Sequence, residues 1–241
     1  MWVVAQASAM LASLLSAVLV GLAGRVIRVE VDVAAGLPGT TIVGLADAAL
    51  LEARERVRGA IRNSGLVYPP RRITVNLAPA DLRKGGASLD LAIAVGIVVG
   101  SEQLRATAGT AVIGELSLGG EVRTPPGLLP MIAALQGSGV SRVLVPTEGL
   151  AETRLLGGME PIGVATLAEA VAALRSGRRG RTVAIPSRID LAGTGTAATP
   201  GTRTHAPGAE ESEVPDLAEV RGQLEARRAL EVALAGGHGL L

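Results

Sequence analysis

Cysteine and phenylalanine are absent from this 241-residue sequence, and tryptophan, tyrosine and lysine occur once each. Without cysteine, the chain can form neither disulfides nor thiolate metal sites. The two histidines, His205 and His238, lie in a polar segment and near the C-terminus, so a histidine metal site is not expected either. Because aromatic rings are so few, any contact with nucleic acid would depend on charge rather than on stacking of bases.

The sequence also lacks an overall excess of charge, since its formal net charge is +1. Whole-chain charge therefore does not indicate a nucleic-acid partner. The charge is uneven, however, because residues 54–84 contain eight basic and two acidic residues, an excess of six. The basic residues are Arg54, Arg56, Arg58, Arg62, Arg71, Arg72, Arg83 and Lys84.

Residues 71–99 combine a strand, a polar loop and an apolar helix with few residues between them. Alternation of apolar and polar residues predicts a strand over residues 73–77, which Pro79 ends. The loop of residues 81–86 follows. Ser88 then has the position and chemistry of a helix N-cap, with Asp90 in the first turn. Residues 89–99 are apolar almost all round, which predicts a buried central helix.

Strands and helices alternate over the rest of the chain up to about residue 176. Periodicity predicts strands at residues 25–33, 40–43, 142–145 and 161–164, a hairpin of residues 111–116 and 120–123, and helices at 47–64, 128–135 and 167–174. Asp47 is expected to cap its helix and Gly65 to end it. This order of elements indicates an α+β or α/β domain with helices packed on a sheet.

The two ends of the chain differ in composition from this region. The side chains of residues 1–24 carry no charge, and the apolar run of residues 10–22 is diluted by Ser13, Ser16 and Gly21. This favours an N-terminal extension over a signal peptide or a membrane span. Residues 177–215 have a basic start and are rich in glycine, threonine, proline and alanine, so a flexible linker is expected. Residues 217–235 have the pattern of one long amphipathic helix or a helix pair.

Three motifs, GLPGTTIVGLAD, NLAPADLRK and GELSLGGEVR, make the chain similar to the N-terminal domain of the ComM (YifB) family of Mg-chelatase-like AAA+ ATPases. The resemblance runs over residues 18–175 and resumes over 216–241, which is similar to the opening of the ATPase module. It implies an extension at 1–17, a ribosomal-S5-domain-2-like fold shared with Lon protease at 18–176, and a linker at 177–215. Val220, Gly222 and Gln223 would then lie on the nucleotide side of the ATPase segment.

The resemblance to Lon raises the possibility of a Ser-Lys peptidase. Lys84, Gly86 and Ser88 match the K-x-G-x-S motif of Lon-type proteases, and residues 114–122 match their G-E-x-x-L-x-G-E-V motif. Leu129 stands where the lysine of that dyad is expected. Serine is a poor nucleophile without a base, and Lys84 is expected to be solvated on its loop. We therefore predict no catalytic residue, while a residual peptidase stays an alternative.

Nucleotide binding cannot be assigned to this sequence alone. A P-loop requires a Gly-Lys pair, and none occurs. The chain ends with GGHGLL, which in the resembled family leads into the strand before the P-loop. We therefore expect no cofactor in this chain, whereas the resemblance implies ATP and Mg for the full-length protein.

DNA is the partner that the resemblance implies, because ComM-like proteins are ring-forming ATPases that act on DNA, including branch migration during transformation. Arg71, Arg72, Arg83 and Lys84 bracket the strand at residues 73–77 and are the candidate phosphate contacts. The alternatives are that these side chains are simply solvated and that the domain serves only in oligomerisation. We also expect self-association into a ring in the full-length protein, a cytoplasmic location and no membrane partner.

Overall fold

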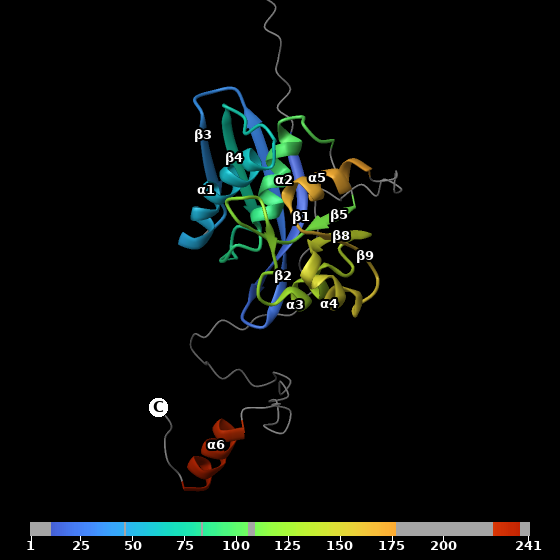
Figure 1. Cartoon of the computed structure of the whole chain (residues 1–241). Helices are drawn as coiled ribbons and strands as arrows, with labels where there is room; N and C mark the ends of the chain where they lie inside the picture. Colours follow the sequence, from blue (N-terminus) through green and yellow to red (C-terminus); the bar gives the residue numbers. More distant parts are fainter. Residues whose placement is uncertain (1–10, 46, 83, 106–108, 177–223, 237–241) are drawn as a thin grey trace, which may run out of the picture. The chain divides into compact units, whose positions relative to one another are not determined.

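The computed structural model describes residues 11–45, 47–82, 84–105, 109–176 and 224–236 (Figure 1). The chain divides into two units between Asp190 and Leu191. The second unit contributes one described helix, α6 (Leu224–Gly236). The predicted linker, the start of the predicted terminal helix and the nucleotide-side candidates Val220, Gly222 and Gln223 lie outside the described residues.

In the described part of the first unit, seven strands form one sheet in the order β3-β4-β2-β1-β5-β8-β9 (Figure 1). β2 is antiparallel to β1 and to β4, and the other four pairings are parallel. The predicted α/β class is thus confirmed, with a mixed and mostly parallel sheet. The strands are β1 (Ala12–Val20), β2 (Ala23–Ala34), β3 (Gly39–Val43), β4 (Arg72–Ala78), β5 (Thr110–Val112), β8 (Arg142–Pro146) and β9 (Glu160–Val164).

β1 lies in the middle of the sheet, and its position corrects the predicted N-terminal boundary. It begins at Ala12, pairs with β2 along its whole length and pairs with β5 through Leu15. Leu14, Ser16 and their neighbours up to Val18 are all buried. A strand that is covered on both faces lacks the usual polar alternation. The prediction of an extension is therefore wrong for residues 12–17, which belong to the sheet.

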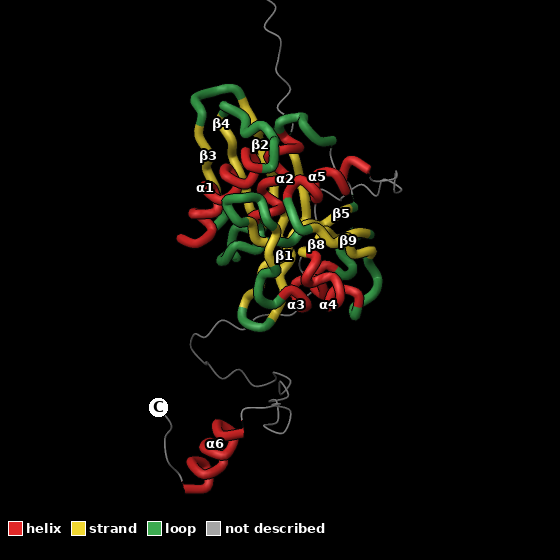
Figure 2. The backbone as a smooth tube through the Cα atoms, viewed as in Figure 1, coloured by secondary structure: helices red, strands yellow, loops and turns green. Residues whose placement is uncertain are grey.

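Helices cover both faces of the sheet (Figure 2). Alternate residues of β1 enter two different apolar cores, Leu14 and Val18 on one side and Leu15 and Ala17 on the other. The first core is completed by α1 (Ala48–Asn63), α2 (Asp90–Gly100) and α5 (Leu167–Ser176). The second is completed by α3 (Leu128–Leu135) and by α4 (Leu150–Arg154), which follows the short 3-10 helix Thr147–Gly149.

α2 packs on β1 and β2 and contacts both α1 and α5, so all eleven of its residues are buried. Its first turn differs from the prediction. The residue that precedes the helix is Leu89, without a side-chain cap, and the Ser88 hydroxyl bonds to the carbonyl of Ala17 instead. The predicted N-cap role of Ser88 is therefore wrong. The predicted cap of α1 is confirmed, because the N–H of Leu50 donates to Asp47 Oδ1 at 2.8 Å.

The other predicted elements of the first unit are confirmed to within a few residues, except the hairpin. β5 is not part of that hairpin. Its three residues are buried in the seven-stranded sheet, where β5 pairs in parallel with β1 and β8. Only β6 (Glu115–Leu116) and β7 (Val122–Arg123) pair as a two-stranded sheet. Within the described ranges, no helix is long and apolar enough to cross a membrane.

Candidate functional site

The serine at the Lon-like nucleophile position faces the protein interior. Ser88 is 4% exposed, and its hydroxyl donates to the carbonyl of Ala17 at 3.4 Å. The N–H of Gly114 donates to the Ser88 carbonyl at 3.1 Å, which fixes this segment against the connection between β5 and β6. Leu129 lies in the first turn of α3 and has no group that accepts a proton. No described side chain hydrogen-bonds to the Ser88 hydroxyl, so the geometry provides no activated nucleophile.

Lys84 is fully buried, so the prediction that it is solvated is wrong. Its ammonium donates to the carbonyl oxygens of Gly44 at 2.9 Å, of Leu82 at 2.6 Å and of Pro79. These three acceptors replace water around the charge, which makes burial of the lysine possible. Desolvation lowers the pKa of Lys84, and the charge of Asp81 opposes that shift. An ammonium enclosed in this way joins two loops and cannot contact a phosphate at the surface.

A buried ion pair joins α1 to the start of α2, two residues beyond Ser88. Arg56 Nε donates to Asp90 Oδ2 at 2.7 Å, and Arg56 Nη2 donates to Asp90 Oδ1 at 3.3 Å. Burial raises the pKa of Asp90, and Arg56 opposes this increase. Glu52, one helical turn before Arg56 in α1, is exposed, and its Oε2 lies 3.9 Å from Arg56 Nη1. One signal of this pair is visible in the sequence, an acidic residue, Asp90, at the start of an otherwise apolar helix.

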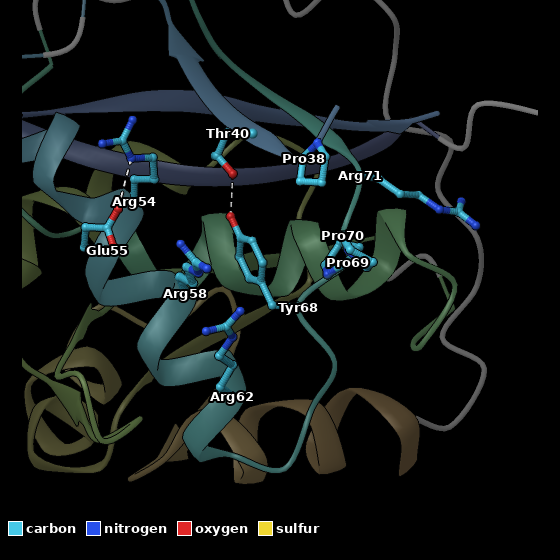
Figure 3. Close-up of a pocket in the computed structure, with 11 residues that line it drawn as sticks. Pro38, Thr40, Arg54, Glu55, Arg58, Arg62, Tyr68, Pro69, Pro70 and Arg71 are labelled. Atoms are coloured by element: carbon cyan, nitrogen blue, oxygen red, sulfur yellow. Dashed lines mark hydrogen bonds and ion pairs between the residues drawn. The ribbon is translucent and has the colours of Figure 1, made fainter. Parts of the chain in front are cut away.

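An arginine-lined pocket lies between α1 and the segment that leads into β4 (Figure 3). Arg54, Arg58 and Arg62 recur every four residues, so they lie on one side of α1. Arg71 lies on the rim, and its side chain extends away from those of α1. The cavity has a volume of about 320 Å³, and its other lining residues are Pro38, Gly39, Thr40, Glu55, Tyr68, Pro69 and Pro70.

The single tyrosine of the chain organises this pocket. The guanidinium of Arg58 lies 5.9 Å from the centroid of the Tyr68 ring, which is the geometry of a cation–π contact. The Tyr68 hydroxyl is hydrogen-bonded to Thr40 Oγ1 in β3, so the ring is fixed at both ends. Arg54 pairs with Glu55 at 3.3 Å. Among the described residues, no ion pair involves Arg58 or Arg62.

The four residues predicted to contact DNA do not share one environment in the structure. Arg71 and Arg72 are exposed at the start of β4, as a surface contact requires, whereas Lys84 is buried and Arg83 lies outside the described residues. Sequence reasoning missed the arginine-lined pocket, although the spacing of the arginines at residues 54, 58 and 62 is its signal. No group of histidine and acidic side chains in the described ranges could hold a metal ion.

Comparison with known proteins relates most of this chain to one family. The family model for subunit ChlI of Mg-chelatase matches residues 29–149. The chain is 38% identical to the protein YifB of Escherichia coli over 217 residues, which are 89% of this chain and 39% of YifB. It is 34% identical to the competence protein ComM of Haemophilus influenzae over 226 residues, which are 92% of this chain and 41% of ComM.

A shorter similarity connects the chain to a protease. Over 116 residues it is 31% identical to Lon protease 2 of Bacillus subtilis, which covers 48% of this chain and 21% of that protein. The chain thus spans about 40% of the length of the YifB and ComM relatives that it matches.

Proposed function

Because the chain belongs to the family of YifB and ComM, we propose that it is the non-proteolytic N-terminal region of an AAA+ ATPase that acts on DNA. ATP hydrolysis would be performed by a P-loop that this sequence does not contain. A full-length protein of this kind would use ATP and Mg, assemble into a ring and work in the cytoplasm. The role of the present chain would be to hold the DNA.

The proposal of an inactive Lon-like fold is supported by both the similarity and the site. The similarity to Lon protease 2 extends over 116 residues. In a Ser-Lys peptidase the lysine must take the proton of the serine hydroxyl. Here Ser88 bonds to a backbone carbonyl, and the ammonium of Lys84 is occupied by three other carbonyls. Neither residue is free to perform the first proton transfer.

The observation that carries the DNA proposal is the arginine face, which we define as Arg54, Arg58, Arg62, Arg71 and Arg72. All five side chains are exposed, and in the described residues Glu55 is the only acidic side chain that forms an ion pair with any of them. Guanidinium groups bind phosphate oxygens strongly, and such contacts do not depend on base sequence. This suits a protein that must hold DNA of any sequence.

The test is DNA binding by the full 241-residue chain across a salt series, measured by fluorescence anisotropy. The test variant replaces Arg58, Arg62, Arg71 and Arg72 by alanine. The matched control replaces Arg123, Arg142, Arg154 and Arg175, which lie in β7, β8, α4 and α5 and remove the same charge. Each phosphate contact that is lost from single-stranded DNA should reduce the slope of log K against log salt by about 0.7.

We expect the test variant to lose up to about 2.8 in that slope, from four contacts, and the control to lose much less. Circular dichroism would check that both variants are folded. Equal losses in the two variants would mean that only net charge matters, and no binding by the wild type at low salt would refute the DNA proposal.

A further inference from the structure

The arginine-lined pocket is concave, which distinguishes it from the rest of the arginine face. It is bounded by α1 on one side, by Tyr68 and Pro69 on another, and by Pro38 and Thr40 at the start of β3 (Figure 3). Its volume of about 320 Å³ exceeds that of a single phosphate group. A ligand would enter this concave site from the solvent side, with its anionic group first.

The charge of the pocket lining favours a dianion over a monoanion. Four of the lining side chains are positive, Arg54, Arg58, Arg62 and Arg71, and Glu55 is negative, so the net charge is four minus one, or +3. A phosphate monoester carries about −1.5 to −2 near neutral pH, whereas a phosphodiester inside a DNA strand carries one negative charge. The pocket thus matches the charge of a monoester better than that of a diester.

One cationic group of the pocket, Arg58, is held in place before any ligand binds. Tyr68 positions the Arg58 guanidinium, and Thr40 positions Tyr68. Arg62 lies one helical turn further along α1 and also points toward Tyr68 in Figure 3. Because Arg58 is already placed, less conformational entropy is lost when it binds an anion. The fork of a guanidinium also suits two oxygens of the same phosphate.

We propose that the arginine-lined pocket binds the terminal phosphate monoester of a DNA strand, an inference that rests on the proposed DNA function. A terminal phosphate has one organic substituent and can enter a concave site, whereas an internal phosphate continues into the strand on both sides. A second cavity of about 370 Å³ adjoins the first and shares Pro69, Pro70 and Arg71 with it. It has room for the attached nucleoside, and Arg71 at the border is placed to meet the next phosphate.

The experiment compares short single-stranded oligonucleotides of one sequence that carry a 5′-phosphate, a 3′-phosphate or no terminal phosphate. Their affinities for the full chain are measured by competition at constant ionic strength. We expect a terminal phosphate to tighten binding about tenfold, as one charge-assisted hydrogen bond can do. This advantage should disappear in the Arg58→Ala/Arg62→Ala variant and persist in Arg123→Ala/Arg142→Ala. It should also shrink at about pH 5, because the second phosphate pKa is about 6 while guanidinium stays charged.

The outcomes separate this inference from the function on which it rests. If all three oligonucleotides bind the wild type equally, the pocket proposal is overturned and the DNA proposal stands. If none binds, the DNA function fails, and inorganic phosphate becomes the probe in a thermal unfolding assay. A rise in Tm that Arg58→Ala/Arg62→Ala abolishes would then support a phosphate pocket for free small molecules, whereas no rise would overturn the pocket altogether.

Discussion

The ion pair between Arg56 and Asp90 offers the sharpest test of how this domain is held together. Asp90 has no exposed side-chain surface, while Arg56 keeps about a quarter of its side chain in solvent, at 24%. The change Arg56→Met removes the guanidinium and keeps much of its apolar stem. Among the described residues, the carboxylate of Asp90 would then keep only a long contact with the N–H of Leu116, at 3.5 Å.

The expected cost follows from burial of an uncompensated charge. Removing one partner of a buried ion pair typically costs about 3–5 kcal/mol, against a total of about 5–15 kcal/mol for a domain of this kind. Asp90→Asn should cost less, because the cation that it leaves behind, Arg56, is partly exposed. The double variant Arg56→Met/Asp90→Asn should be more stable than Arg56→Met alone, since position 90 then carries no uncompensated charge.

The free energy of unfolding should depend on pH with a defined sign. Burial raises the pKa of Asp90 above its ordinary value, so the folded state binds more protons than the unfolded state between these two values. Stability therefore falls as pH rises through the folded pKa. Arg56 lowers that pKa, so its removal moves the pKa higher still. The loss caused by Arg56→Met should be largest near neutral pH and should shrink on acidification, as Asp90 becomes protonated.

Urea unfolding of the full chain, followed by circular dichroism at neutral and mildly acidic pH, gives the required free energies. Arg54→Met is the matched control, because its ion pair with Glu55 is exposed on the same helix and is worth at most about 1 kcal/mol. The reasoning is refuted if Arg56→Met costs no more than this control, or if its cost does not decrease with falling pH.

Three further predictions concern the interior. Lys84→Met should lower the free energy of unfolding by about 1–3 kcal/mol, because it leaves buried carbonyls unsatisfied; an unchanged urea midpoint would contradict this role. Ser88 should not react with a fluorophosphonate probe in the folded protein, and Ser88→Ala should change no hydrolytic activity, so labelling of Ser88 detected by mass spectrometry would revive the peptidase. Gly96→Ala should cost about 1–3 kcal/mol although alanine favours helices, because the added Cβ would lie 2.6 Å from a methyl of Val31; an increase in Tm would show that α2 can move away from β2.

The local elements could be predicted because their patterns of apolar residues show which of their faces are buried. β4 alternates because one of its faces lies on the first core, and α2 is apolar all round because the sheet and two helices enclose it. β1 was not predicted, because a strand covered on both faces has a continuous apolar pattern instead of an alternating one. The two serines of β1 also resemble an interruption of that apolar pattern.

The candidate site was harder to predict, because its residues meet only in three dimensions. Arg56 and Asp90 are 34 positions apart in the sequence, so no local rule predicts their ion pair. The sequence also gives no indication that Lys84 bends inward, since the three carbonyls that hold it are backbone groups that every residue carries. The arginine-lined pocket needs α1, Tyr68 and β3 together, although the four-residue spacing along α1 is visible in the sequence.

The burial of Lys84 has a consequence for the chemistry of the surface. Lys84 is the only lysine in the sequence, so every exposed basic side chain of the arginine face is a guanidinium, and no lysine amine is available to acylating reagents. Lysine acetylation cannot cancel that charge, and no physiological change in pH can remove it, because arginine keeps its proton in proteins. Control of the affinity for a polyanion would therefore have to act through the anion, through the salt concentration or through rearrangement of the assembly.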